Sequence, residues 1–145
     1  MSVATEQKRL VQQSFSQIVP ISEQAAQLFY DRLFQLDPHL RPLFTSDMNN
    51  QRKKLMQTLA LAVSGLDNLS GLIPVLQRLA VRHVGYGVRN EHYAIVGDAL
   101  LWTLEQGLGD AFTDDVRAAW AEVHRLISTV MLEAATSVQS AMNSV

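Results

Sequence analysis

His83 is the residue whose position most clearly allows chemistry. It continues an apolar stripe at helical spacing, and Gly85 and Gly87 follow at the point where such a helix ends. The stripe consists of Leu72, Leu76 and Leu79. A neutral imidazole on an apolar helix face can ligate a metal ion, or it can bond to a backbone carbonyl near the helix end. Taken alone, the histidine favours the second, structural role.

The other histidines offer His83 no metal-binding partner. They are His39, His92 and His124, and none of them lies three or four residues from His83. A two-histidine clamp on one helix face is therefore absent, which argues against a hydrolytic zinc site. A single histidine on an apolar wall suits a cofactor that carries its own equatorial ligands, and haem is such a cofactor.

A second group of residues could form the opposite wall of the same pocket. Tyr30 lies within an apolar stripe, Phe44 ends a proline-containing segment, and Gln51 stands one helical turn before Leu55. Each of these residues alone has an ordinary interpretation, as core for Tyr30 and Phe44 and as surface for Gln51. Two hydrogen-bond donors and an aromatic ring, together with one histidine, favour a haem pocket.

The composition limits the other possibilities. A chain of 145 residues with 48% hydrophobic residues can form one domain with one core. Without cysteine it can hold no disulfide, no thiol nucleophile and no cysteine-ligated zinc or iron–sulfur site. The net charge of −2 and the lack of a long basic block argue against nucleic-acid or membrane-surface binding as the main role.

The terminal and apolar segments give an expectation about location. The first residues are polar and include an acidic residue, so they do not resemble a signal peptide. No apolar run approaches the roughly 18 residues that a transmembrane helix needs. We therefore expect a soluble, cytoplasmic protein.

The elements that must position these residues all read as helices. Apolar residues recur at helical spacing in six segments, 5–18, 22–36, 50–66, 69–83, 90–106 and 113–142. A short further helix is expected from Asp37-Pro38 to Phe44, because proline is favoured at the first helical position. Ser22 and Thr113 are expected N-caps, and Pro74 is expected in the first turn of its helix. The pattern predicts an all-α domain of about seven helices.

The order and spacing of several motifs resemble the globin family. They are F-Y-x-x-L-F at 29–34, P-x-x-R-x-L-F at 38–44, Q-x-x-K-L at 51–55, R-H-x-x-Y-G-V at 82–88 and H-Y-x-I-V-G-x-x-L-L at 92–101. The chain is most similar to single-domain bacterial globins related to flavohaemoglobin haem domains, and more distantly to neuroglobins. The resemblance covers nearly the whole chain. It implies a globin fold of seven to eight helices over residues 1–145, packed around haem b.

The resemblance also implies a role for individual residues. His83 would be the proximal iron ligand, with its second ring nitrogen donating to the backbone near Leu79. Phe44 would pack on the haem, and Tyr30, Gln51 and Leu55 would line the distal side, where oxygen, carbon monoxide or nitric oxide binds. The residues expected to touch the porphyrin beyond the turn are Val88, Tyr93 and Val96. Lys54 and Arg82 could meet the haem propionates or be ordinary solvated cations.

One position departs from the flavohaemoglobin pattern. In those relatives a glutamate on the last helix joins a tyrosine in polarising the proximal histidine. The tyrosine is present as Tyr93, but the corresponding position on the last helix is Ala135. Glu133, two residues away, would point to nearly the opposite side of a helix. We therefore expect weaker polarisation of His83 than in those relatives.

Three functions are compatible with this pattern. The first is reversible oxygen binding for storage, transport or scavenging, which requires no enzyme activity. The second is nitric oxide dioxygenation, for which a separate reductase would be needed because no motif for flavin or NADH binding is present. The third is gas sensing, although no output domain is visible. A helical interaction module without haem is the remaining alternative, and the chain could be a monomer or a homodimer.

Overall fold

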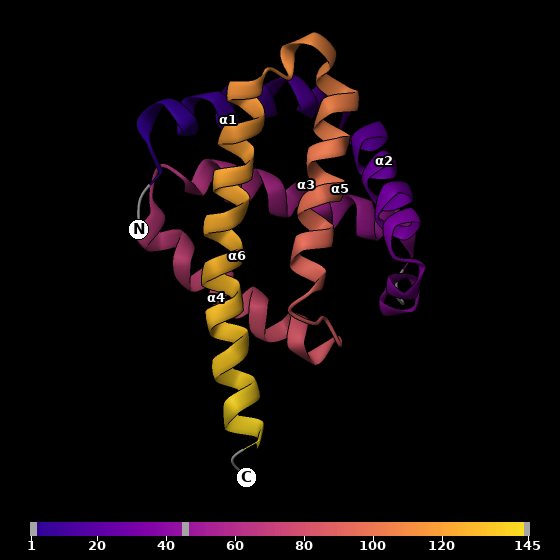
Figure 1. The fold of residues 1–145 in the computed structure, drawn as a ribbon, viewed down its shortest axis with the longest axis vertical. Helices are drawn as coiled ribbons and strands as arrows, with labels where there is room; N and C mark the ends of the chain where they lie inside the picture. Colours follow the sequence, from indigo (N-terminus) through magenta and orange to yellow (C-terminus); the bar gives the residue numbers. More distant parts are fainter. Residues whose placement is uncertain (1–2, 45–46, 144–145) are drawn as a thin grey trace.

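The computed structural model describes residues 3–44 and 47–143, and the elements within these ranges are exclusively helical (Figure 1). The α-helices are α1 (Thr5–Ile18), α2 (Ser22–Leu36), α3 (Met48–Gly65), α4 (Leu69–Gly85), α5 (His92–Leu108) and α6 (Asp114–Asn143). The 3₁₀ segments are η1 (Val19–Ile21), η2 (Pro38–Leu43) and η3 (Gly109–Ala111). The prediction of an all-α fold is confirmed.

The number of α-helices in these ranges is six, below the seven to eight expected, because the short third helix is a 3₁₀ segment. Pro38 is the first residue of η2, where a missing N–H costs no helix bond, but Pro42 lies inside the segment and cannot donate to the carbonyl four residues before it, which disfavours an α-helix there. Asp37 caps the segment through its side chain, which accepts a hydrogen bond from the N–H of His39 at 3.0 Å. The tight turn places Phe44 directly after it.

Side-chain caps set the start of three helices. At the start of α3, the side chain of Asp47 accepts a hydrogen bond from the N–H of Asn49. At the start of α4, the side chain of Asn68 accepts one from the N–H of Gly71, and at the start of α6 the side chain of Thr113 accepts one from the N–H of Val116. The Thr113 cap agrees with the sequence prediction. The Ser22 prediction is wrong, because Ser22 is already helical and its hydroxyl donates to the Val19 carbonyl of the preceding turn.

Pro74 lies farther inside α4 than expected. It is the sixth residue of the helix and not part of its first turn, so the bond that its N–H would give to Ser70 is missing. Pro74 and Ser70 are both exposed, and water can satisfy the free carbonyl. The prediction failed because it assumed that the helix could not tolerate this loss.

Two apolar clusters hold the helices together. The larger one joins α1, α2, α5 and the first half of α6, and Trp120 lies within it. The indole N–H of Trp120 donates to the hydroxyl of Ser14 at 2.8 Å and so ties α6 to α1. The smaller cluster joins α4 to the second half of α6. Figure 1 shows α5 and α6 running side by side, with α4 crossing near the far half of α6.

The helices α3 and α4 meet closely at one end. A Cβ on Gly65, the last residue of α3, would lie 2.8 Å from the side chain of Leu72 in α4. After α4 the chain turns at Gly87, whose φ of +90° favours glycine, and this turn approaches Leu43 at the end of η2. These contacts place the helix that carries His83 beside the segment that carries Phe44.

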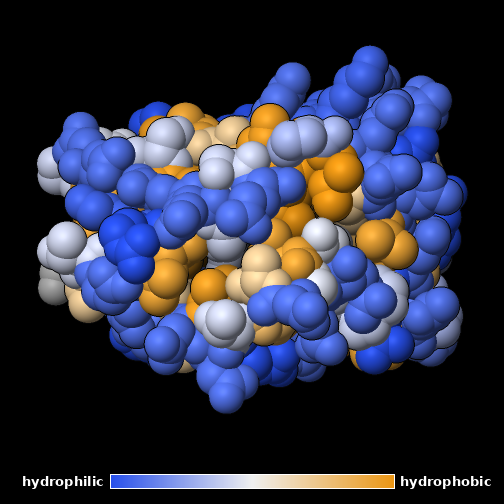
Figure 2. All heavy atoms as spheres, turned by 90° about the horizontal axis from the view of Figure 1, so that it is seen from above, coloured by the Kyte–Doolittle hydropathy of each residue, from blue (hydrophilic) through white to orange (hydrophobic). Residues whose placement is uncertain are grey.

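The face of the molecule seen in Figure 2 carries mainly hydrophilic side chains at its edges, with hydrophobic side chains gathered between them toward its centre. Within the described ranges, none of the helices has the length and apolar character that crossing a membrane requires.

The close contact of α5 and α6 at Gly97 provides a test of this packing. A Cβ at this buried residue would lie 2.5 Å from the ring of His124, so we expect Gly97→Ala to destabilise the fold by about 1–3 kcal/mol. The measurement is the free energy of unfolding in urea. Gly85→Ala is the matched control, because nothing lies within 4 Å of a Cβ there and alanine is the better helix former. Equal stability of the Gly97 variant and the unmodified protein would contradict this packing.

Candidate functional site

Tyr30 is the centre of an aromatic cluster on one wall of the site. It lies on the inner face of α2 with 6% of its surface exposed. Its ring meets Phe44 edge-on at a centroid distance of 5.4 Å and Phe29 at 5.2 Å, and Phe34 packs on both Tyr30 and Phe44. The helix α2 and the end of η2 thus bring together Tyr30 and Phe44, which the sequence assigned to the same wall.

The hydroxyl of Tyr30 points toward the start of α3. It donates to the backbone carbonyl of Gln51 at 3.4 Å, which is near the outer limit of a hydrogen bond. Burial raises the pKa of Tyr30 to about 12, so the hydroxyl keeps its proton throughout the physiological range. The group is therefore a neutral donor held by a weak bond, and it can turn to a better acceptor.

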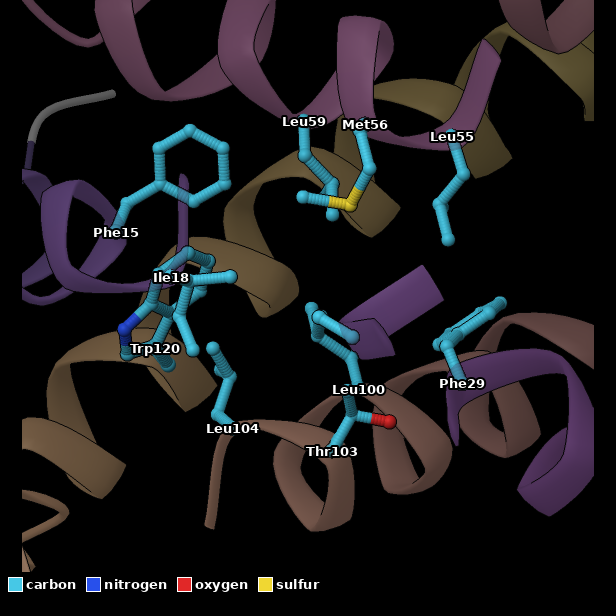
Figure 3. A pocket seen from close by; sticks show the side chains of 11 residues that line it. Phe15, Ile18, Phe29, Leu55, Met56, Leu59, Leu100, Thr103, Leu104 and Trp120 are labelled. Atoms are coloured by element: carbon cyan, nitrogen blue, oxygen red, sulfur yellow. The ribbon is translucent and has the colours of Figure 1, made fainter. Parts of the chain in front are cut away.

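Leu55 connects this wall to the interior. It lies one turn after Gln51 on α3 and lines an apolar cavity of about 10 Å³ between α3 and the helices α1, α2, α5 and α6. Figure 3 shows Leu55, Met56 and Leu59 projecting from α3 toward Leu100 and Leu104 of α5. Phe29 lines the same cavity and also packs on Tyr30. Phe29 thus connects the aromatic cluster around Tyr30 to the apolar interior.

His83 lies in the last turns of α4, within the segment that the sequence identified. Its Nδ1 atom is buried and has no hydrogen-bond partner. Burial lowers the pKa of His83 most, the nearby charge of Arg82 lowers it further, and the backbone carbonyl of Leu79 acts in the opposite direction. The ring is thus neutral near pH 7 and keeps a lone pair on one nitrogen.

The carbonyl of Leu79 is near the ring, as expected, but it does not make a hydrogen bond of ordinary geometry with Nδ1. A buried polar atom without a partner is uncommon in a folded protein and calls for an explanation. A neutral imidazole carries one proton, so a proton on Nδ1, on the side of Leu79, leaves the lone pair on Nε2, and that atom can bind a group that the protein itself does not supply.

The remaining apolar residues of this side lie around the turn after α4. The N–H of Val88 donates to the carbonyl of His83 at 3.0 Å, which fixes Val88 beside the end of α4. Tyr93, in the first turn of α5, packs against the cluster between α4 and α6, as Leu79 does. Val96 packs instead against the larger cluster. Burial raises the pKa of Tyr93, so its hydroxyl is also a neutral group.

The two cations predicted beside the pocket are at the surface. Lys54 and Arg82 are both exposed, and within the described ranges neither forms an ion pair with an acidic side chain. Nothing in the structure tests their predicted contact with propionates. Of the described residues, no three histidine or carboxylate side chains are grouped so that they could hold a metal ion.

Near the end of α6, Ala135 and Glu133 point to different sides of the helix, as expected. Ala135 is 2% exposed, whereas Glu133 is exposed to solvent. The carboxylate of Glu133 therefore does not replace the side chain that Ala135 lacks.

His124 is a residue of this region that the sequence analysis did not single out. Its ring packs on Gly97, its Nε2 lies 3.3 Å from the hydroxyl of Ser128, and it interacts with the backbone of Tyr93. It thus supports the start of α5, where Tyr93 lies. The only sequence signal is Gly97 itself, since a glycine inside a helix often marks close packing.

Comparisons with known proteins agree on one family. The family model described as Globin matches residues 27–131. A flavohemoprotein from Halalkalibacterium halodurans is 33% identical over 139 residues, which is 92% of this chain and 34% of that protein. One from Bacillus subtilis is 34% identical over 123 residues, 79% of this chain and 30% of that protein. The chain spans about a third of the length of these relatives.

Solved structures share the fold. An engineered carbene transferase, derived from a candidate nitric oxide dioxygenase of Rhodothermus marinus, superposes with a TM-score of 0.87 at 24% identity and covers 98% of this chain and 99% of that one. A bacterial globin from Campylobacter jejuni gives a TM-score of 0.76 at 24% identity, covering 94% and 99%.

The support that His124 gives to α5 can be tested by pH. Burial lowers the pKa of His124 most, and the Tyr93 carbonyl and the charge of Asp98 oppose that shift. A lowered pKa means that the unfolded chain takes up the proton first. Stability is therefore present above the unfolded value of about 6.5 and is lost as the pH falls through the folded pKa.

We expect the free energy of unfolding to fall less in the His124→Gln variant than in the unmodified protein when the pH is lowered from 7 to 5. Urea unfolding across this range measures the difference, and His83 and every carboxylate are common to both proteins and serve as the internal control. Parallel pH profiles would show that His124 does not contribute as described.

Proposed function

Because the chain belongs to the globin family, we propose that residues 1–145 act as one globin domain that binds haem b, with His83 as the residue that would hold its iron. The residues present fit such a group. His83 offers a neutral imidazole with a buried, unpartnered nitrogen on an apolar face. The opposite wall carries the aromatic cluster of Tyr30 and Phe44. Haem, when bound, supplies an iron centre that binds diatomic gases and exchanges single electrons.

The two walls would have different tasks. His83 would hold the cofactor, with Leu79 one turn before it on the same helix. Val88, Tyr93 and Val96 would supply apolar surface beyond the turn. On the other side Phe44 supplies a ring for stacking, and Leu55 keeps water away from the ligand. The exposed Lys54 and Arg82 would be free to meet the two propionates. Tyr30 and Gln51 would donate hydrogen bonds to the bound gas.

The activity that the relatives favour is nitric oxide dioxygenation. What supports it is the likeness to flavohemoproteins and to a candidate nitric oxide dioxygenase. The buried, protonated hydroxyl of Tyr30 is compatible with it, since a neutral donor would favour a gas that carries partial negative charge. The reaction combines nitric oxide with oxygen and one electron to give nitrate. The electron would come from a flavin-containing reductase outside these 145 residues, because the chain spans only about a third of its flavohemoprotein relatives.

Reversible oxygen binding is the second candidate, and one observation favours it. Ala135 is buried where the flavohaemoglobin pattern has a carboxylate, and Glu133 is on the exposed side of α6. His83 would then be less strongly polarised, which suits binding better than oxidative chemistry. The two candidates are separated by the rate at which NADH and a cell lysate restore the ferrous protein after nitric oxide is added. Rapid, repeated turnover with nitrate formation supports the enzyme, and a single turnover supports the carrier.

Haem binding itself is tested by absorption. The purified protein with added haem should give a Soret band that shifts with carbon monoxide. His83→Leu should weaken haem retention at least tenfold, since loss even of a partner that only supports a ligand costs about 10–100-fold. His39→Leu, at an exposed position on η2, is the control and should keep the band. If the unmodified protein gives no Soret band, the proposal is wrong.

The role of Tyr30 is tested by the rate of oxygen release. A hydrogen bond to a charged acceptor is worth roughly 1.5–3 kcal/mol, so Tyr30→Phe should speed release at least tenfold. The matched control is Tyr86→Phe, because Tyr86 is 66% exposed and lies outside the pocket. Stopped-flow replacement of oxygen by carbon monoxide measures the rate. An unchanged rate in the Tyr30 variant would remove Tyr30 from the gas-binding side.

A further inference from the structure

The charged residues of this chain are strongly segregated. The segment from η2 to the turn after α4, residues 38–90, holds seven of the twelve basic residues and only two of the fourteen acidic ones. The basic residues are Arg41, Arg52, Lys53, Lys54, Arg78, Arg82 and Arg89, and the acidic ones are Asp47 and Asp67. The small net charge of the whole chain therefore hides a cationic region that carries the proposed pocket.

The ion pairs deepen this difference. Outside the segment, Lys8, Arg9, Arg117 and Arg125 each pair with a carboxylate, and Arg32 lies over the ring of Trp102. Within it, Asp67 is the carboxylate that pairs with Lys8, and Arg41 lies over the ring of Phe34. Among the described basic residues of the segment, only Arg89 forms an ion pair, with Glu91 at 3.9 Å. The charge of the cationic segment is thus not neutralised by the protein. Two propionates could occupy only two of its cations.

The exposed side of α4 combines this charge with apolar surface. Arg78, Val81 and Arg82 are spaced i, i+3 and i+4, so they share one exposed face. Val81 is 45% exposed, and Tyr86, which ends the helix, is 66% exposed. Arg89 follows in the turn. Tyrosine and arginine around an apolar centre are the composition typical of protein interfaces.

We propose that this α4 face, formed by Arg78, Val81, Tyr86 and Arg89 beside Arg82, whose own charge is assigned to a propionate, is the docking surface for an acidic electron-donor protein. The inference rests on the proposed function, because only a cofactor that cycles needs a donor. The face lies on the helix that carries His83, so a partner docked there comes close to the cofactor. The partner's acidic surface would meet Arg78, which has no acidic partner among the described residues, and Arg89, whose exposed pair with Glu91 at 3.9 Å it would replace. Tyr86 and Val81 would be buried at the centre.

A protein fits this face better than a nucleic acid does. Twelve acidic residues lie outside the cationic segment and would repel an extended polyanion. A protein with a local acidic patch needs to match only the α4 face. Such complementarity steers association, and it raises on-rates by about 10–10³-fold at low salt.

The test titrates the haem-loaded protein with an acidic flavodoxin as the probe, by calorimetry at low salt and again at about 0.5 M salt, where charges are screened. Arg78→Glu combined with Arg89→Glu should weaken binding at least tenfold at low salt and little at high salt. Arg9→Glu combined with Arg117→Glu is the matched control, because it changes the net charge equally in the other part of the molecule. It should weaken binding no more than twofold. Tyr86→Ser should weaken binding at both salt concentrations.

Equal effects of the two double variants, or binding that ignores salt, would overturn the docking surface. Tighter binding to duplex DNA or to vesicles rich in phosphatidylserine than to flavodoxin, lost in the same α4 variant, would overturn the choice of a protein partner. Calorimetry does not depend on turnover. If flavodoxin binding depends on these charges but no nitric oxide is turned over, the proposed function is wrong and the docking surface stands. If nitric oxide is turned over and the α4 variant does not change the rate, the docking surface is wrong and the proposed function stands.

Discussion

The packing of α4 on the second half of α6 is the constraint on which the proposed pocket depends. Leu72, Leu76 and Ala80 bury one face of α4 against Val130 and Met131 of α6. Because residues on a helix keep a fixed angular spacing, burial of that face also fixes where His83 points. The longest helix of the chain thus acts as the support for the histidine, and the Trp120–Ser14 hydrogen bond anchors the same helix to α1.

Burial also gives the two walls their complementary chemistry. An apolar environment disfavours charge, so it raises the pKa of Tyr30 and lowers that of His83. One physical cause thereby leaves a neutral hydroxyl that can donate on one side and a neutral imidazole that can bind a metal on the other. The same apolar surroundings that suit a porphyrin make these two polar groups effective. Of the charged side chains, the basic ones are concentrated on η2, α3, α4 and the turn after α4. This concentration gives the outer surface of these elements a separate role in recognition.

Several features of the interior were decided by small residues and local exceptions. Gly97 lets the ring of His124 approach α5 closely, which no motif had indicated. Pro74 is tolerated inside α4 because the carbonyl of Ser70, which lacks the hydrogen bond that Pro74 cannot donate, is on the exposed side of the helix and can bond to water. Pro42 disfavours an α-helix in the segment before Phe44, which is a 3₁₀ segment, and Phe44 follows it against the ring of Tyr30.

Helical periodicity, the absence of cysteine and the ordered motifs around Tyr30, Phe44, Gln51 and His83 determined the all-α class, the family and the residues proposed for the pocket. Those signals are local, since each follows from spacing along one helix or one turn. The tertiary structure decided what depends on residues far apart in the chain, namely the contact of Tyr30 with Phe44 and the carbonyl of Gln51, the unpartnered nitrogen of His83, and the role of His124. It also showed which cations lack a partner. Burial and pairing are properties of the packed chain, so no single segment of the sequence contains them.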